Sequence, residues 1–376
     1  MYFLISIFML LGIFYLGFLA KILSGLKKVS QISFSNEKKP FVSVIVPFRN
    51  ESDVILKCLR SLETQKYPTE KYEILFVDDF SEDDSVLKLT SEKQLAETKI
   101  LSVPNEYQTL SPKKRCIKYG IENAKGEIIL TTDADCLHQK NWIAAMVSTF
   151  DESTGFVSGL VKFSDAKKLF GKIQQLEFGG LVLTGAGLIG TGSPTICNAA
   201  NIAFRKDAFD FVGGYDDNQH LSSGDDEFLM QKIAKSDKYK VQFLFSENAV
   251  VETEANRSVS GFIQQRKRWA SKGLFYNDKM LILKLIFIYF FFLSLPVQLL
   301  LGLILHSIFL YSFIIMVLGK VILEYLILKK GIPLLYRFME FPVFVFAEIL
   351  HVPYIILAGF AGALGNFEWK GRNLKR

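Results

Sequence analysis

Cysteine and histidine are both scarce in this chain, with four residues of each among 376. The four cysteines are far apart in the sequence and form no CxxC pair, which argues against a disulfide framework and against a zinc site, and is typical of a domain kept reduced in the cytosol. A dense basic stripe is also lacking. The formal net charge is only +6 and the basic residues are spread along the chain, so no nucleic-acid partner is expected.

Apolar residues, by contrast, are plentiful. Half of the residues are hydrophobic, 34 residues are Phe, and the mean hydropathy is +0.25. The apolar excess lies at the two ends, whereas residues 36–280 have the composition of a soluble domain. The sequence therefore predicts three parts: an N-terminal transmembrane anchor over 1–28, a cytoplasmic globular domain over 36–278, and C-terminal transmembrane or interfacial helices with a basic tail over 279–376.

The first apolar segment, residues 2–20, has no charge and is long enough to cross a hydrocarbon core of about 30 Å as a helix. It lacks the basic start and small-residue cleavage site of a signal peptide, so we interpret it as a signal anchor. Cations follow it at Lys21, Lys27 and Lys28, which predicts that the next domain is cytoplasmic.

Two further spans are predicted at 281–304 and 307–328, and a third apolar segment covers 338–364. Three spans here would put the basic tail outside the cell, against the positive-inside rule, whereas an interfacial or re-entrant third segment would keep the tail inside. The sequence leaves both arrangements open. Either one predicts a multi-pass protein of the plasma or inner membrane. The basic tail consists of Lys370, Arg372, Lys375 and Arg376.

Between these ends, short β-branched runs alternate with helical segments. Such alternation predicts right-handed βαβ units and an α/β domain with a mostly parallel sheet. A glycine-rich stretch, 179–192, is interpreted as a loop or helix near the membrane or the acceptor. The predicted strands are 41–48, 72–79, 99–103, 127–135, 155–163, 196–204 and 241–245, and the predicted helices are 51–64, 83–96, 112–124 and 225–235.

Polar groups follow three of the predicted strands, at Pro47–Glu51, Asp78–Asp79 and Asp133–Asp135. In an open α/β sheet, ligands bind at the carboxyl ends of the strands, so we expect these groups to converge at one edge. Carboxylates are preferred ligands of Mg²⁺ and Mn²⁺, and such a cation neutralises a departing diphosphate. The alternative for Asp133 and Asp135 is a surface turn with two solvated acids; for Asp78 and Asp79 it is a helix N-cap.

Two later motifs add charge. The acids of Gly224–Glu227 open a predicted helix, where they either complement the helix dipole or supply a general base. Gln265–Trp269 reads QRKRW and precedes the membrane tail. It is either an interfacial basic helix with Trp at headgroup depth or a contact for donor phosphates through Arg268.

Taken together and in this order, the motifs resemble those of the family 2 glycosyltransferases, whose catalytic domain has the GT-A fold. The resemblance runs from about residue 40 to 275, and the membrane flanks are similar to those of membrane-bound members. The segments that carry it are VSVIVPFRNE (42–51), ILFVDDFSEDDS (74–85), KKRCIKYGIENAKGEIILTTDAD (113–135), CNAANIAFRKDAFDFVGGYD (197–216), GDDEFLMQKI (224–233) and QRKRW (265–269).

The resemblance implies a role for each matching residue. Donor binding falls to Glu51, Asp79, Lys113, Asp133 and Arg268. The acceptor side comprises Gln265, Trp269, Asn201 and Asn198. The metal ligand is Asp135, and the general base is Asp226. Three positions depart from the family pattern without removing a needed group: Phe80 in place of glycine, Asp225 in place of Glu, and Cys116 in place of alanine.

The resemblance thus implies an inverting, metal-dependent hexosyltransferase that uses Mg²⁺ or Mn²⁺. We expect a nucleotide-sugar donor, UDP-linked, and a lipid or growing polysaccharide acceptor at the membrane. The QxxRW motif with C-terminal spans slightly favours a processive synthase over a single-transfer lipid glycosyltransferase. If the chain were a non-catalytic scaffold that kept the fold, we would expect at least one charged site residue to be lost, but all of the charged site residues are present. A transporter is weakly supported, because three or four spans show no obvious repeat.

Overall fold

A computed structural model of the chain describes residues 1–34, 38–216, 224–271, 276, 278–336, 338–364, 367–369 and 372–374. The predicted domain boundary at residue 36 and three of the tail cations, Lys370, Lys375 and Arg376, lie outside the described residues.

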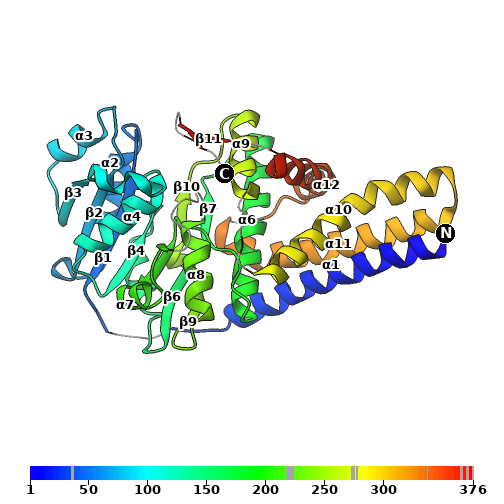
Figure 1. Cartoon of the computed structure of the whole chain (residues 1–376), viewed down its shortest axis with the longest axis horizontal. Coiled ribbons are helices and arrows are strands. Elements are labelled where there is room, and N and C mark those ends of the chain that lie inside the picture. The colour runs from blue at the N-terminus through cyan, green and yellow to red at the C-terminus, as the bar shows by residue number, and fades with distance from the viewer. Residues whose placement is uncertain are drawn as a thin grey trace.

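The core of the molecule is a seven-stranded sheet in the order β3-β2-β1-β4-β8-β6-β9 (Figure 1). The strand β8 pairs antiparallel with both of its neighbours, and the other pairs in the sheet are parallel. The predicted α/β class with a mostly parallel sheet is therefore confirmed. The strands are β1 (Val42–Phe48), β2 (Tyr72–Asp78), β3 (Glu97–Ser102), β4 (Ile128–Thr131), β6 (Thr154–Gly159), β8 (Ile202–Arg205) and β9 (Lys240–Leu244).

The register of the central strands puts their carboxyl ends at one edge. Phe48 at the end of β1 pairs with Asp78 at the end of β2, and Ile45 pairs with Thr131 at the end of β4. Nearly every residue of these three strands is buried, because helices cover both faces of a parallel sheet. The polar residues that follow the strands are thus brought to the same edge of the sheet.

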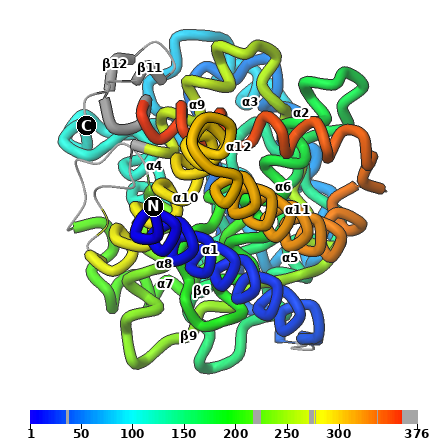
Figure 2. Tube along the Cα trace, turned by 90° about the vertical axis from the view of Figure 1, so that its right-hand side faces the viewer, coloured from blue at the N-terminus to red at the C-terminus, as the bar shows by residue number. Residues whose placement is uncertain are grey.

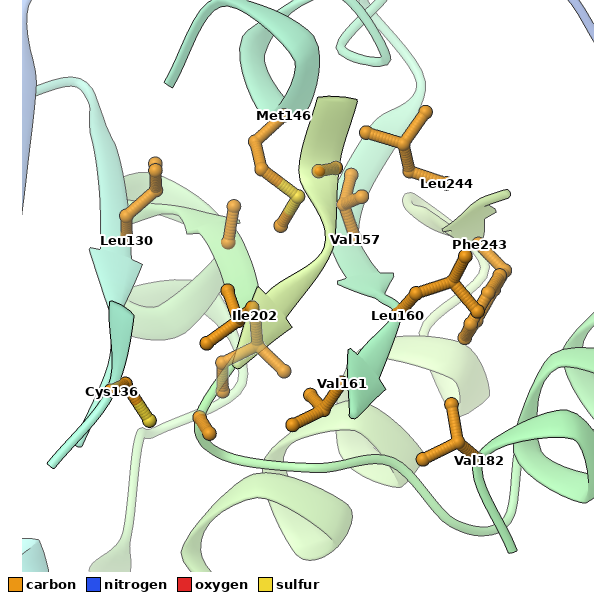
Figure 3. Packing of buried hydrophobic residues seen from close by; sticks show 14 of the residues in the cluster. Leu130, Cys136, Met146, Val157, Leu160, Val161, Val182, Ile202, Phe243 and Leu244 are labelled. Atoms are coloured by element: carbon orange, nitrogen blue, oxygen red, sulfur yellow. The ribbon is translucent and has the colours of Figure 1, made fainter. Parts of the chain in front are cut away.

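Helices and a small second sheet complete the domain. The second sheet has the order β5-β10-β7, with β5 (Leu137–His138), β7 (Val161–Phe163) and β10 (Val251–Thr253). Figure 3 shows the apolar packing between the two sheets and their helices, with Met146 of α5 and Val182 of α6 turned toward the strands. The helices are α2 (Ile55–Glu63), α3 (Ser85–Ser91), α4 (Pro112–Asn123), α5 (Trp142–Val147), α6 (Leu169–Gly190), α7 (Lys206–Phe211), α8 (Asp225–Lys235) and α9 (Val259–Ser271).

The glycine-rich stretch 179–192 forms most of the long helix α6, one of the two alternatives predicted for it. Its glycines allow a close crossing with α1 (Tyr2–Val29). A Cβ atom on Gly25 would lie 1.8 Å from the carbonyl oxygen of Gly187, and one on Gly187 would lie 2.5 Å from that of Ile22. The two backbones are therefore in contact, and this crossing fastens the N-terminal helix to the globular domain.

Within the described residues, four helices are long and apolar enough to cross a membrane: α1, α10 (Lys279–Ile304), α11 (Ser307–Leu335) and α12 (Phe341–Leu364). The first three run side by side away from the sheet in Figure 1. The fourth, α12, runs across them, as Figure 2 shows from the end of the bundle. A short hairpin of β11 (Phe367–Trp369) and β12 (Arg372–Leu374) follows it.

Two predicted strands are shorter in the structure. The strand predicted over 127–135 ends at Thr131, because the following residues turn: the amide of Cys136 donates to the carbonyl of Asp133 at 3.1 Å. The strand predicted over 196–204 begins at Ile202, and the residues before it form a loop. Both loops lie at the edge of the sheet where the candidate site is found.

Candidate active site

The ends of β1 and β2 are joined by a buried arginine. Arg49 donates from Nη1 to the carbonyl of Asp79 at 2.8 Å and also to that of Phe80, while its Nη2 pairs with Glu82 at 2.7 Å. The next residues turn sharply, and the amide of Glu51 donates to the Ser85 hydroxyl at 2.8 Å. This network fixes the backbone of the half-buried Glu51 beside the end of β2.

Asp79 is almost fully buried and forms an ion pair with Arg115 of α4. Phe80 after it has a φ of +59°, a backbone conformation that favours glycine, and this explains the glycine usual in the resembling family. Here the Arg115 guanidinium lies 5.3 Å from the centre of the Phe80 ring. That contact compensates part of the strain, so the turn is kept without the glycine.

Lys113 and the Asp133–Asp135 loop form the next group. The Lys113 ammonium lies 2.5 Å from Asp133 Oδ1 and 4.0 Å from Asp225 Oδ2. Burial lowers the pKa of Lys113, but Asp133 and Asp225 outweigh it and hold the pKa above its ordinary value. Asp135, two residues further on, accepts a hydrogen bond from Thr253 Oγ1 at 3.2 Å. Lys113 is thus charged and lies among three carboxylates.

The first turn of α8 contributes three buried acids. Asp226 Oδ1 accepts from the amide of Glu227 at 2.8 Å, and Glu227 accepts from the Tyr276 hydroxyl at 2.6 Å. Asp225 Oδ2 is buried and accepts no hydrogen bond from the described residues. Burial raises the pKa of Asp225, Lys113 opposes that rise, and the neighbouring Asp226 adds to it. These acids therefore face Lys113 and Asp133 across the site.

Helix α9 brings the QRKRW segment to the same place. Gln265 accepts from the side-chain amide of Asn256 at 2.8 Å. Arg266 is buried, forms an ion pair with Glu177 of α6 and lies 4.3 Å from the centre of the Trp269 ring. The pKa of Arg268 is lowered overall, because burial has a larger effect than the three acids that face it and raise the pKa. These acids are Asp133, Asp225 and Asp226. The helix is thus held by Arg266, and Arg268 faces the acids.

One predicted residue does not face the site. Asn201 is fully buried, donates to the carbonyls of Leu160 and Ala249 at 2.8 and 2.7 Å, and accepts from Trp142 Nε1 at 2.9 Å. Every polar atom of its amide is used within the fold, so its predicted role in acceptor binding is replaced by a structural one. Asn198, which precedes it in the same segment, lines the cavity described next.

A single cavity of about 930 Å³ connects these groups. It reaches from the end of β1 to α9 and continues between the membrane helices. The geometric prediction that the strand-end acids meet in one place is therefore confirmed, while the chemical role of each residue stays a prediction. The predicted residues that line the cavity are Glu51, Asp79, Lys113, Asp133, Asp135, Asp226, Gln265, Arg268 and Trp269.

The sequence reasoning missed the residues that support the site from behind. Arg49, Arg115 and Glu177 each hold a site segment through a buried ion pair or hydrogen bond. Arg49 and Arg115 lie next to motif residues, but an isolated arginine gives no sign of its partner. Glu177 lies in an apolar segment, where a lone acid is the only signal that it pairs with a distant cation.

The donor set fits a divalent cation. Asp133 and Asp135 present carboxylate oxygens to the cavity from one turn, and the buried, unbonded Oδ2 of Asp225 lies across from them. Hard oxygen donors of this kind suit Mg²⁺ or Mn²⁺.

Comparison with known proteins identifies the fold first. The chain superimposes on a mannosyltransferase from Pyrobaculum calidifontis, solved in complex with GDP-Man and Mn²⁺, with a TM-score of 0.58 and 18% identity over 96% of this chain and 99% of that one. The sheet and this likeness define a GT-A fold with four candidate transmembrane helices.

The family follows from the sequence. Residues 43–213 match the family model described as Glycosyl transferase family 2, so the chain contains a family 2 glycosyltransferase domain. A glycosyltransferase named AglE from Haloferax volcanii is 29% identical over 194 residues, 50% of this chain and 59% of that protein. A beta-monoglucosyldiacylglycerol synthase from Trichormus variabilis is 27% identical over 242 residues, 62% of this chain and 49% of that protein. The matches thus span about half to three fifths of these relatives.

A third relative makes a polymer. It is a poly-beta-1,6-N-acetyl-D-glucosamine synthase from Staphylococcus aureus, 25% identical over 281 residues, 71% of this chain and 62% of that protein.

Proposed function

We propose that the chain is an inverting glycosyltransferase that moves a sugar from a nucleotide-sugar donor to an acceptor hydroxyl at the membrane surface. The observation that carries the proposal is the single cavity. It is lined by strand-end acids, by the α8 acids and by the α9 arginine, which come from segments far apart in the sequence. Two of the relatives are named as synthases of a glycolipid and of a polysaccharide, so both acceptor classes are candidates.

The donor nucleoside is assigned to the end of the cavity formed by Glu51 and Asp79. Arg49 holds the backbone of Asp79 and Arg115 pairs with its carboxylate. A carboxylate at this end of the cavity can accept hydrogen bonds from a base or a ribose. The diphosphate would lie next to Lys113 and Arg268, which are the cations that face the acids. Asp133 already binds Lys113 and so orients its ammonium group.

Asp226 is assigned as the general base. It lies at the start of α8, buried and within the cavity, and its charge acts on Arg268 of α9. It would take the proton of the acceptor hydroxyl while that oxygen attacks C1 of the sugar and the nucleoside diphosphate leaves from the opposite side. A single displacement inverts C1, and no covalent nucleophile is required.

Asp135 is assigned as a ligand of Mg²⁺ or Mn²⁺, with Asp133 next to it. When bound, the cation supplies positive charge to the leaving diphosphate. Thr253 orients the Asp135 carboxylate through its hydroxyl.

The charged residues indicate how the chain meets the membrane. Each of the three helices that run side by side carries a charged residue about 25–30 Å from the end of the bundle that points away from the sheet, at 1.5 Å per residue. These residues are Lys21 of α1, Lys284 of α10 and Glu324 of α11. That distance matches the hydrocarbon thickness of a bilayer. We therefore propose three spans, with these residues at the cytoplasmic boundary.

Helix α12 is proposed to lie along that boundary instead of spanning. It runs across the bundle (Figure 2), and its Glu348 lies 2.5 Å from Lys320 of α11, which also contacts Glu324 of its own helix at 2.9 Å. This arrangement keeps Arg372, the tail cation that the structure describes, on the cytoplasmic side, as the positive-inside rule requires. The proposal thus corresponds to the interfacial alternative for residues 338–364.

The proposal is tested with the full chain purified in nanodiscs and a panel of radiolabelled UDP- and GDP-sugars in the presence of Mn²⁺. We expect one donor to be consumed, with label transferred to an acceptor from membrane extract. A non-catalytic scaffold would consume none of them, and that result would refute the proposal. The size of the labelled product separates a processive synthase from a single-transfer enzyme.

A further inference from the structure

The cavity does not end at the catalytic acids. Beyond Trp269 it continues between α10, α12 and α6, where apolar side chains line it. Four of these side chains also face the outside of the molecule: Leu285, Ile286 and Phe290 of α10 and Phe360 of α12 are 37%, 41%, 50% and 62% exposed. The cavity is therefore polar at one end and apolar at the other, and its apolar part opens sideways.

The opening lies at the proposed membrane boundary. Leu285 and Ile286 follow Lys284, which marks that boundary on α10, and α12 lies along it. Apolar side chains exposed at this depth face the hydrocarbon of the inner leaflet. A hydrocarbon chain can therefore pass from the leaflet into the cavity without contact with water.

Helices α10 and α12 are in close contact at Tyr289 and Gly359, beside the apolar part of the cavity. A Cβ atom on Gly359 would lie 2.4 Å from the ring of Tyr289, and the Tyr289 hydroxyl donates to the carbonyl of Ile356. Tyr354, which also lines the cavity, donates to Glu177 at 2.9 Å and so links α12 to the ion pair that holds α9. The apolar part of the cavity is thus built onto the same supports as the catalytic part.

The charge of the cavity restricts the head group. Among the described residues that line it, eight are acidic and four are basic. Three of the basic ones form ion pairs: Arg49 with Glu82, Lys113 with Asp133 and Arg266 with Glu177. A donor diphosphate adds negative charge that a divalent cation balances, so the acidic excess remains. A second phosphate next to Asp226 would be repelled, whereas a neutral hydroxyl would not.

We propose that the acceptor is a membrane lipid whose head group ends in an uncharged hydroxyl, and that its hydrocarbon chain reaches the cavity between α10 and α12. The inference rests on the proposed function and narrows its acceptor to one class. In the reaction the lipid oxygen forms a bond to C1, the bond between C1 and the diphosphate oxygen breaks, and the hydroxyl proton passes to Asp226. The products are a glycolipid and a nucleoside diphosphate.

The test uses the full chain in nanodiscs that contain one of three acceptors: diacylglycerol, a polyprenyl phosphate, or neither lipid with a soluble oligosaccharide added. Label from the active donor is expected in the diacylglycerol arm, at least tenfold above the other two. More label in the polyprenyl phosphate arm or on the oligosaccharide would overturn the inference.

A matched pair of variants tests the route. Leu285→Trp fills the apolar part of the cavity and is expected to reduce transfer to diacylglycerol at least tenfold. Leu283→Trp adds the same ring two residues away on a side chain that does not line the cavity, and should stay within twofold of wild type. Melting temperatures show that both variants fold. Equal effects of the two variants would overturn the lateral route.

The two proposals fail in different ways. If no donor is hydrolysed or transferred with any acceptor, the glycosyltransferase function itself is refuted. If the donor is hydrolysed, and Asp226→Asn slows this, but diacylglycerol receives no label, only the lipid inference is refuted.

Discussion

The substitution Asp226→Asn separates catalysis from binding most cleanly. Asp226 is 7% exposed, and its Oδ1 accepts from the Glu227 amide at 2.8 Å. Asparagine keeps that acceptor and the side-chain shape, so α8 should begin at the same residue and the melting temperature should change little. What is lost is the ability to take a proton.

Loss of a general base typically costs about 10²–10⁴-fold in rate, or roughly 3–5 kcal/mol in the barrier. We therefore expect kcat to fall by about that factor. The KM for the donor should stay the same or decrease, because one negative charge near the diphosphate is removed and Lys113 remains in place. This combination is expected only if Asp226 acts on the acceptor.

The assay measures transfer of labelled sugar to the lipid acceptor at saturating donor concentration. Donor affinity is measured separately by calorimetry. Asp210→Asn, on the exposed side of α7, is the matched control and should behave as wild type. If Asp226→Asn retains more than a tenth of kcat, the assignment of the base is refuted. If donor binding weakens tenfold, Asp226 acts on the donor instead.

Three further predictions follow from single contacts. For metal binding, EDTA should abolish activity and Mn²⁺ restore it, and Asp135→Asn should raise the Mn²⁺ needed for half-maximal rate at least tenfold; unchanged Mn²⁺ dependence would contradict the ligand assignment. Burial lowers the pKa of His138 to about 3, so below pH 6.5 the unfolded chain binds a proton that the folded chain does not. The free energy of unfolding should therefore fall by about 2 kcal/mol between pH 7.5 and pH 5. Thermal unfolding at these two pH values should show a smaller loss for His138→Gln than for wild type. Gly25→Ala should lower the melting temperature by forcing α1 from α6, whereas Gly17→Ala, which meets nothing within 4 Å, should not; equal effects would refute the backbone contact.

The sequence by itself determined the main strands and helices and the edge of the sheet where the candidate site lies. Buried β-branched runs alternating with helices permit little except a parallel sheet, and ligands bind at the carboxyl ends of its strands. The polar residues after β1, β2 and β4 could therefore be expected to meet, and Glu51, Asp79 and Asp135 do line one cavity. Local patterns were sufficient here because the register of parallel strands fixes which ends are adjacent.

Asn201 shows where that reasoning fails. Its residue type and its motif both indicated a role in binding. In the structure its side-chain amide instead forms hydrogen bonds with two backbone carbonyls and the Trp142 indole, which lie 41 to 59 residues away in the chain. Burial and hydrogen-bond partners of this kind depend on the packing of distant segments, which no local pattern records. The same applies to the ion pair between Arg266 and Glu177.

Only the tertiary structure decided how the membrane segments are arranged around the site. Hydropathy indicates that 338–364 is apolar, but hydropathy carries no direction, and α12 runs across the other three helices (Figure 2). Its direction is set by its contacts with α11 and α6, through Glu348 to Lys320 and through Tyr354 to Glu177. Because the cavity is lined by segments far apart in the sequence, the sequence could predict the strand-end acids that line it but not its apolar part between α10 and α12.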